Sequence, residues 1–375
     1  MPDAKEIIKG FGTAEGRWAR LGPYYAMFPL DFAFEVIENY SKHGDFIIDP
    51  FAGRCSSIYA GSVLGRSSLG IEINPVGWLY GTTKLQPAEK EDVIYRLSEI
   101  YNKRNYYRRA VERMPQFYRL CYCDEVLKFL LSARKNLDWK CNNVDATLMS
   151  IILVYLHGKI GEGLSNQMRM TMSMGMNYSI EWWKKNGLTK APIINPYSFV
   201  LNKIEWRYKK GKPKTYDSAV VFGDSELELQ SIVKNAHRNE IKFSLLFTSP
   251  PYYSVTDYHK DQWLRLWLLG DNEIPHTSRD KHRRRFVNKE DYYSLLDNVF
   301  GLSSQIMADQ STIYVRTDKR EYTYNSILEI LQKHFPKHLL TTLDKPIASG
   351  VRTQTSLYGQ TSMKPGEIDI ILQRK

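Results

Sequence analysis

Two short apolar runs separated by one helical stretch constrain the fold of this chain more than any other feature. Residues 45–49 (DFIID) lead into a turn of small residues at 50–53, a helical pattern follows, and a second apolar run lies at residues 68–73. This spacing is typical of a βαβ unit, in which a helix joins two parallel strands. Residues 1–80 are therefore predicted to be α/β, with a further helix over residues 30–40.

The rest of the chain divides into a helical middle and an α/β end. A length of 375 residues exceeds the usual size of one domain, so two domains or one domain with a large insertion are expected. Apolar periodicity predicts helices over 92–113, 124–135 and 144–157, and strands at 218–222, 243–248, 311–316 and 367–373. The simplest architecture is one α/β domain, residues 1–80 and 216–375, interrupted by a mainly helical insertion at 81–215.

The net charge of +11 lies entirely in one segment. Residues 81–218 contain 24 Lys or Arg and 13 Asp or Glu, and the remainder contains 28 of each sign. A basic segment in an otherwise neutral chain indicates a polyanionic partner, most simply nucleic acid. The alternative is a solvated helical face with surplus lysine, which the interleaved Tyr and Trp residues disfavour. The segment ends at residues 206–214 (WRYKKGKPK), which resemble a basic linker.

Composition disfavours a membrane protein and a metal framework. No stretch approaches the roughly 18 consecutive apolar residues of a membrane-spanning helix. The amino terminus lacks the apolar centre of a secretory signal, so a soluble, cytoplasmic protein is expected. The four cysteines have neither the pairing of a zinc site nor that of a disulfide framework, and reduced structural thiols are expected instead: Cys55, Cys121, Cys123 and Cys141.

The turn after the first strand has the features of a cofactor-binding turn. Small residues at 50–53 allow backbone amides to approach a ligand at the carboxyl end of a parallel strand. About twenty residues later Glu72 ends the second strand, where a carboxylate can accept hydrogen bonds from both ribose hydroxyls of an adenosine cofactor. The strand, the turn and the distant acid together predict such a site.

A second motif, Thr248-Ser249-Pro250-Pro251-Tyr252, follows the strand at 243–248 directly. Two successive prolines hold the backbone extended and remove two amide donors, which leaves carbonyls such as that of Pro250 free to accept. Ser249 adds an acceptor and Tyr252 a flat surface for stacking. Two acceptors on an exocyclic amino group favour a pyramidal nitrogen with an available lone pair. The alternative is a loop that merely contains a Pro-Pro turn.

Asp-Pro-Phe-x-Gly followed far downstream by Ser-Pro-Pro-Tyr resembles the DNA amino-methyltransferases, which make N4-methylcytosine or N6-methyladenine. The resemblance covers residues 20–80 and 216–375 and implies a Rossmann-like, S-adenosylmethionine-dependent methyltransferase fold that closes with an antiparallel hairpin near residues 357–373. It assigns Ser249, Pro250, Pro251 and Tyr252 to catalysis and implies no metal. It assigns these residues to the cofactor: Phe28, Pro29, Asp49, Phe51, Ala52, Gly53, Glu72, Asn74, Asp224 and Ser225.

The implied reaction is methyl transfer from S-adenosylmethionine to an amino group of a base that is flipped out of DNA. Serine at the first position of the catalytic motif is typical of the enzymes that modify N4 of cytosine, which makes N4-methylcytosine the expected product. The alternatives are an N6-adenine DNA methyltransferase, an RNA base methyltransferase and a DNA-binding module without catalysis. C5-cytosine chemistry is disfavoured, because none of the four cysteines follows a proline. A partner restriction endonuclease acting on the same site is a further expectation, and the oligomeric state stays open.

Two departures from the family pattern concern the cofactor turn and the insertion. Arg54 and Cys55 replace the usual small residues after Gly53, and the variable segment lies earlier in the chain than the usual recognition domain. The insertion at 81–215 is a candidate target-recognition region. Its residues Asn166, Gln167, Arg169, Trp182 and Trp183 either read bases or organise the fold of the insertion, with the second favoured. The basic run 279–285 is either a phosphate contact or a solvated loop.

Overall fold

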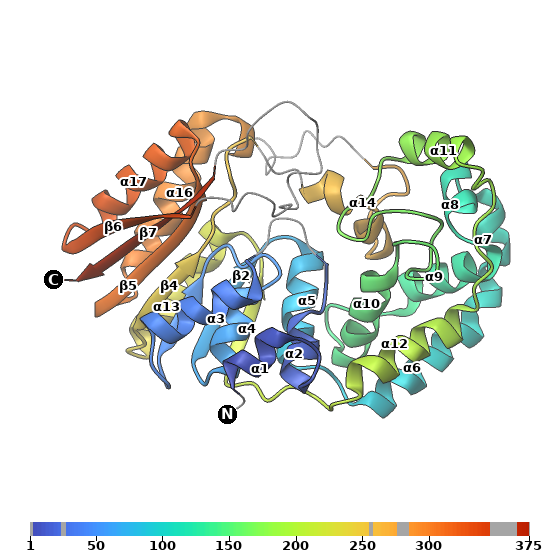
Figure 1. The fold of residues 1–375 in the computed structure, drawn as a ribbon, viewed down its shortest axis with the longest axis horizontal. Coiled ribbons are helices and arrows are strands. Elements are labelled where there is room, and N and C mark those ends of the chain that lie inside the picture. Colours follow the sequence, from blue (N-terminus) through green and yellow to red (C-terminus); the bar gives the residue numbers. More distant parts are fainter. Residues whose placement is uncertain (1–2, 24–27, 255–257, 276–284, 346–365, 375) are drawn as a thin grey trace.

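The computed structural model describes residues 3–23, 28–254, 258–275, 285–345 and 366–374. Its centre is a seven-stranded sheet with the order β3-β2-β1-β4-β5-β7-β6 (Figure 1). The strands are β1 (Phe46–Asp49), β2 (Ser67–Glu72), β3 (Ser218–Phe222), β4 (Phe243–Thr248), β5 (Met307–Asp318), β6 (His338–Lys345) and β7 (Glu367–Arg374). The predicted Rossmann-like α/β fold is confirmed.

All neighbouring strands from β3 to β5 pair in parallel, and β7 runs antiparallel to both β5 and β6. The predicted antiparallel closure is therefore present, but its first strand was misplaced. That strand begins at His338 rather than near Leu357, which lies outside the described residues. One side of β6 is exposed at Leu339, Thr341 and Leu343. Because an exposed side can carry polar residues, β6 lacks the continuous apolar run that indicated the other strands.

Helices cover both faces of the sheet because successive strand residues point to opposite sides. Ile47 and Leu245 point toward α3 (Leu30–Tyr40), α4 (Ser56–Val63) and α5 (Pro75–Leu85). Ile48 and Leu246 point toward α13 (Ser225–Arg238), α16 (Lys289–Ser304) and α17 (Glu321–His334). Two short helices, α1 (Ala4–Lys9) and α2 (Ala14–Ala19), lie beside α3 and α4. The carboxyl ends of the parallel strands stay uncovered by these helices.

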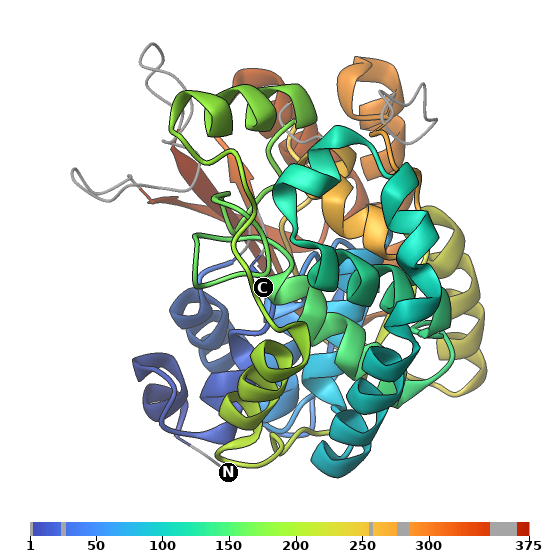
Figure 2. The same cartoon turned by 90° about the vertical axis from the view of Figure 1, so that its right-hand side faces the viewer.

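The middle of the chain forms a second, helical half (Figure 2, facing the viewer). Its elements are α6 (Lys90–Lys103), the 3-10 helix η1 (Arg104–Tyr107), α7 (Arg108–Arg113), α8 (Gln116–Cys121), α9 (Asp124–Asn136), α10 (Asn143–Tyr155), α11 (Met176–Lys185) and α12 (Pro196–Tyr208). The three predicted helical stretches all occur, although the first divides into α6, η1 and α7.

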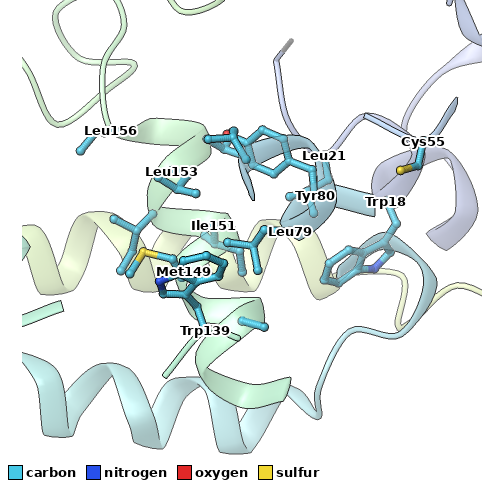
Figure 3. Close-up of a cluster of buried hydrophobic side chains, with 14 of the residues drawn as sticks. Trp18, Leu21, Cys55, Leu79, Tyr80, Trp139, Met149, Ile151, Leu153 and Leu156 are labelled. Atoms are coloured by element: carbon cyan, nitrogen blue, oxygen red, sulfur yellow. The ribbon is translucent and has the colours of Figure 1, made fainter. Parts of the chain in front are cut away.

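One continuous apolar core joins the two halves through α5. Leu79 and Tyr80 of α5 are fully buried against residues of the helical half such as Met149 and Ile151 of α10 (Figure 3). Helix α5 packs both on β3 and on α10, and it crosses residue 81 without a break. The boundary predicted at residues 80–81 therefore falls within a single helix that serves both halves.

The expected basic linker at 206–214 is in part helical and buried. Trp206, Arg207 and Tyr208 form the last residues of α12, and Arg207 is only 3% exposed. Its guanidinium donates to the carbonyl of Arg17, and Arg17 donates in return to the carbonyl of Trp206 at 2.6 Å. The prediction of a linker was wrong over these residues, because both cations are used to join α2 to α12.

Helix α14 (Tyr258–Leu268) follows the Thr248–Tyr252 motif in the chain but packs on the helical half. Trp263 and Trp267, which are four residues apart on α14, are both buried. Arg265 is fully buried and donates to the carbonyls of Leu153 (3.0 Å) and Met170 (2.5 Å). Helix α14 thereby fixes the loop that connects α10 and α11.

The polar residues of that loop mainly hold the loop itself together. Asn166 is fully buried and donates to the carbonyls of Leu120 (3.1 Å) and Leu188 (2.9 Å). The indole of buried Trp183 donates to the carbonyl of Gln167 at 2.7 Å. For Asn166 and Trp183 the structure supports the organising role rather than base reading.

No helix among the described residues is long and apolar enough to cross a membrane.

We predict that Arg265→Met lowers the free energy of unfolding by about 3 kcal/mol. The change removes the donors for two buried carbonyls, and each unpaired buried polar group costs on the order of 1–3 kcal/mol. Urea unfolding followed by circular dichroism measures the difference. Arg238→Met, at an exposed arginine at the end of α13, is the matched control and should change little. Equal unfolding midpoints for the two variants would contradict the role given to Arg265.

Candidate cofactor and catalytic site

A cavity lies where the carboxyl ends of β1, β2, β3 and β4 meet. Its volume is about 550 Å³ including the solvent at its mouth. It is lined by Pro50, Phe51, Gly53, Ile71, Glu72, Ile73, Asp224, Ser225, Ser249, Pro251, Arg285, Phe286 and Leu295. Residues from both predicted motifs, 200 positions apart in the chain, therefore share one cavity. Ligands bind at this edge of open α/β sheets as a rule.

Asp49 holds the two motifs in register rather than facing the cavity. Its carboxylate is 1% exposed and accepts hydrogen bonds from the Ser57 hydroxyl, from the Thr248 hydroxyl at 2.6 Å and from the backbone amide of Phe51 at 3.1 Å. Burial raises its pKa to about 6, and these three donors oppose the rise. Asp49 thus shapes the turn and links it to the end of β4.

The turn at residues 50–53 requires glycine at two places, at Gly53 itself and at Gly77 of the neighbouring helix α5. Gly53 has φ +55°, a left-handed conformation that side chains disfavour. A Cβ at Gly77 of α5 would lie 2.6 Å from the carbonyl oxygen of Gly53, so α5 approaches the turn closely. Ala52 is buried, and its amide donates to the carbonyl of Ile71 at 3.0 Å. Phe51 and Gly53 line the cavity, whereas Ala52 supports the turn from behind.

Glu72 lies at the end of β2 in the wall of the cavity and is only 7% exposed. Its carboxylate accepts the backbone amide of Asn74 at 2.7 Å. Burial raises the pKa of Glu72 to about 8, against the opposing effect of the Asn74 and Gly53 amides. The Asn74 side chain accepts from the Val76 amide at 2.9 Å and caps α5. Asn74 therefore orients the Glu72 carboxylate through its backbone amide and is not among the lining residues of the cavity.

Asp224 and Ser225 line the opposite wall at the start of α13. The Ser225 hydroxyl donates to the carbonyl of Pro50 at 2.5 Å and so joins this wall to the cofactor turn. Asp224 caps α13 and forms an ion pair of 2.5 Å with Arg285, which also pairs with Glu226 at 3.1 Å. The basic run containing Arg285 gave a hint of this residue, but residues 279–284 of the run lie outside the described residues.

Phe286 and Leu295 also line the cavity, and neither was predicted from the sequence. The carbonyl of Phe286 accepts the amide of Ser254 at 2.7 Å, and the carbonyl of Val287 accepts the Tyr253 hydroxyl at 2.8 Å. These contacts bond the segment after the catalytic motif to the segment that carries Phe286. No local pattern could reveal this pairing, because the two segments are more than 30 residues apart.

The catalytic motif forms the remaining wall. Ser249 and Pro251 line the cavity, and Pro250 is buried. The Pro251 carbonyl accepts the hydroxyl of Tyr292 at 3.0 Å, which fixes the extended backbone. Among the described residues no hydrogen bond to the Pro250 carbonyl occurs. The Ser249 hydroxyl donates to the Tyr252 hydroxyl at 3.4 Å, so these two side chains lie in contact.

Phe28 and Pro29 are not among the lining residues of this cavity. The ring of Phe28 stacks on Phe247 of β4 with ring centres 4.7 Å apart, and Pro29 precedes α3 at the surface. Residues 24–27 of the same segment lie outside the described residues. The assignment of Phe28 and Pro29 to the cofactor therefore stays a prediction.

The two residues that depart from the family pattern have structural roles. Buried Arg54 donates to the carbonyl of Gly22 at 3.1 Å and so ties the turn to the segment that leads to Phe28. The ammonium group of Lys84, which is fully buried in α5, donates to the carbonyl of Arg54. Cys55 has φ +62°, and burial raises the pKa of its thiol, which is unsuited to act as a nucleophile. Arg54 and Cys55 are both buried and neither lines the cavity, so these two departures from the family pattern do not fill it.

Comparison with known proteins finds similarity in the amino-terminal part of the chain. The profile of a family described as "DNA methylase" matches residues 6–76. A type II methyltransferase of Methanothermobacter thermautotrophicus, M.MthZI, is 37% identical over 49 residues, which are 13% of this chain and 14% of that protein. The chain thus matches about one seventh of the length of this curated relative.

Solved structures share only a loose likeness with the chain. An rRNA methyltransferase, aviRa of Streptomyces viridochromogenes, aligns over 97% of this chain and 96% of its own, with 9% identity and a TM-score of 0.32. A putative S-adenosylmethionine-dependent methyltransferase of Streptococcus mutans aligns over 92% of this chain and 49% of its own, with 10% identity and a TM-score of 0.34. Likeness at this level says nothing about function.

The matched family thus covers the segment that contains the Asp49–Gly53 turn and Glu72. The Ser249–Tyr252 motif, which lies outside that segment, meets it in one cavity. Over residues 6–76 the chain is thus similar to a DNA methylase family, and over 49 residues it is similar to a type II methyltransferase.

Proposed function

We propose that this protein is an S-adenosylmethionine-dependent methyltransferase that modifies N4 of cytosine in DNA. The observation that carries the proposal is the shared cavity. It brings Glu72 and Asp224, from the predicted cofactor set, against Ser249 and Pro251 of the catalytic motif. A methyltransferase needs the binding site for the methyl donor next to the binding site for the target base, because reacting atoms must be held about 3 Å apart.

The lining of the cavity fits an adenosine cofactor. A buried carboxyl at Glu72 suits two neighbouring ribose hydroxyls, and apolar walls at Phe51, Ile71 and Phe286 suit the flat adenine ring. The open, positive-φ turn at Gly53 leaves room for a ligand, since an added Cβ there would meet no atom within 4 Å. When bound, S-adenosylmethionine supplies a methyl group activated by its positively charged sulfur.

The catalytic motif suits an amino group rather than a carbon nucleophile. The Pro250 carbonyl and the Ser249 hydroxyl can both accept from one exocyclic amino group, which favours a pyramidal nitrogen with a free lone pair. The phenol of Tyr252 offers a surface on which a flipped base can stack. Preorganised acceptors of this kind stabilise the positive charge that develops on nitrogen during transfer.

Serine at position 249 supports cytosine over adenine as the target. In the family that the chain resembles, adenine enzymes usually carry Asp or Asn at this place. A hydroxyl is a shorter acceptor than a carboxylate or an amide, so it suits an amino group in a different position. It can also donate to the ring nitrogen of cytosine, which has no hydrogen at that position.

We predict that cofactor affinity depends on the ionisation of Glu72. With a pKa of about 8, Glu72 is mostly protonated at pH 6 in the free protein. If the carboxylate receives the ribose hydroxyls, affinity should rise up to about tenfold per pH unit below pH 8 and level off above it. Calorimetric titration with S-adenosylhomocysteine from pH 6 to pH 9 measures this rise.

The control for this prediction is Glu72→Gln, titrated with the same ligand. The amino group of the ligand titrates in the same pH range, so only the difference between the two profiles reports on Glu72. Above pH 8 the variant should bind about 1–3 kcal/mol more weakly, since a ribose hydroxyl loses its charged acceptor. Parallel pH profiles for the two proteins would refute the ribose assignment.

We further predict that DNA treated with the protein and labelled S-adenosylmethionine contains N4-methylcytosine. Mass spectrometry of the nucleosides identifies the product. Ser249→Ala should lower turnover with little loss of DNA affinity, because its hydrogen bond strengthens in the transition state. Ser244→Ala, at a serine of β4 outside the cavity, is the control and should retain turnover. Label in N6-methyladenine alone would overturn the cytosine assignment and leave DNA amino-methylation standing.

A further inference from the structure

The cations of the helical half fall into two groups. Those on α6, η1 and α9 are mostly neutralised within the chain: Lys90 by Glu205 at 2.9 Å, Arg96 by Asp145 at 2.6 Å, Arg104 by Glu125 at 2.8 Å and Lys128 by Asp124. In such pairs the acid offsets the charge of the cation, so the pair attracts an anionic partner only weakly. The excess of positive charge in the sequence therefore cannot be spread evenly over this half.

The second group consists of exposed cations on three other helices. They are Arg108, Arg109 and Arg113 of α7, Arg119 of α8, and Lys184 and Lys185 of α11. None of the six forms an ion pair with any residue that the structure describes, and these helices carry only Glu112 and Glu181 as acids. Arg109 and Arg113 share one helix face, since they are four residues apart. We call these six residues the α7–α8–α11 surface.

The α7–α8–α11 surface lies on the outer side of the helical half, away from the sheet (Figure 1). Helix α11 packs on α8, and both lie at the end of the helical half toward which the carboxyl ends of the strands point (Figures 1 and 2). Helices α6 and α12 lie at the opposite end (Figure 1). Exposed aromatic side chains accompany the cations, with Tyr106 86% and Tyr178 58% exposed. A cationic and aromatic surface at the same end of the molecule as the cavity fits a nucleic-acid backbone.

We propose that the α7–α8–α11 surface binds the phosphate backbone of duplex DNA while a base of that duplex occupies the cavity at Ser249. The proposal rests on the proposed function and names the part of the insertion that holds the substrate. Positive charge at this end of the helical half neutralises phosphates and orients the duplex, whereas base identity is read elsewhere.

The segment around the end of α12, which is also rich in lysine and arginine, is disfavoured as a DNA contact. Arg207 is buried, Lys212 pairs with Glu89, and the ammonium group of Lys203 lies 4.7 Å from the ring centre of Tyr155. Lys209, Lys210 and Lys214 are exposed, but they lie at the end of the molecule opposite to the catalytic edge. These three lysines serve as a control set of equal charge.

The test compares two triple variants of the full chain, Arg109→Ala/Arg113→Ala/Arg119→Ala and Lys209→Ala/Lys210→Ala/Lys214→Ala. Fluorescence anisotropy of a labelled DNA duplex gives the affinity between 50 and 200 mM salt. Each lost phosphate contact should flatten the slope of log affinity against log salt by about 0.9. The arginine variant should therefore lose up to about 2.7 in slope, and the lysine variant should keep the wild-type slope.

Binding of S-adenosylhomocysteine is measured on both variants and should be unchanged, which shows that each is folded with its cavity intact. An unchanged slope in the arginine variant, or a larger loss in the lysine variant, overturns the placement of DNA on the α7–α8–α11 surface. That result would leave the proposed function intact if the wild-type protein still methylates DNA. Absence of DNA methylation by the wild-type protein would instead refute the proposed function.

Discussion

The buried carboxylate of Asp49 is the interaction on which the site depends. It accepts from the amide of Phe51 in the turn after β1 and from the hydroxyl of Thr248 at the end of β4. One side chain thus sets the cofactor turn against the catalytic motif. Because the carboxylate is fully enclosed, loss of any one donor would leave part of it unpaired in a medium that penalises such groups strongly. The turn after β1 and the motif after β4 therefore keep their relative positions through this single residue.

The helical half depends on this arrangement through α5 and α14. Helix α5 begins directly after the Glu72 strand, and α14 follows the catalytic motif. Each helix leaves the sheet and becomes part of the other half. The wall that contains Glu72 is therefore connected to the helical half through α5, and the wall that contains Ser249 is connected to it through α14. Buried Arg265 and the apolar contacts of Leu79 and Tyr80 make these connections stiff.

Local patterns in the sequence predicted most of the sheet and the two motifs, because apolar strands and proline or glycine turns depend on neighbouring residues. The same patterns could not place Arg285, Phe286 or Leu295, whose roles arise only when distant segments meet. They also misjudged Arg207, which is cationic and follows an exposed tryptophan, yet donates to a carbonyl 190 positions away. The strand β6 was missed because its side chains are half exposed at the edge of the sheet. Charge counts located the basic half but could not separate paired cations from free ones.

The course of α5 has a consequence for protein engineering. Recognition regions of modifying enzymes are attractive units to exchange between relatives, in the hope of redirecting the enzyme to another target. Here a cut at residues 80–81 would divide a helix whose glycines, Gly77 and Gly81, contact the cofactor turn and Cys55. A transplanted helical half would therefore place a foreign residue at position 81 against Cys55, next to the turn at residues 50–53. Successful chimeras would have to keep α5 whole, with the junction after Leu85, and accept the α14 surface of the host.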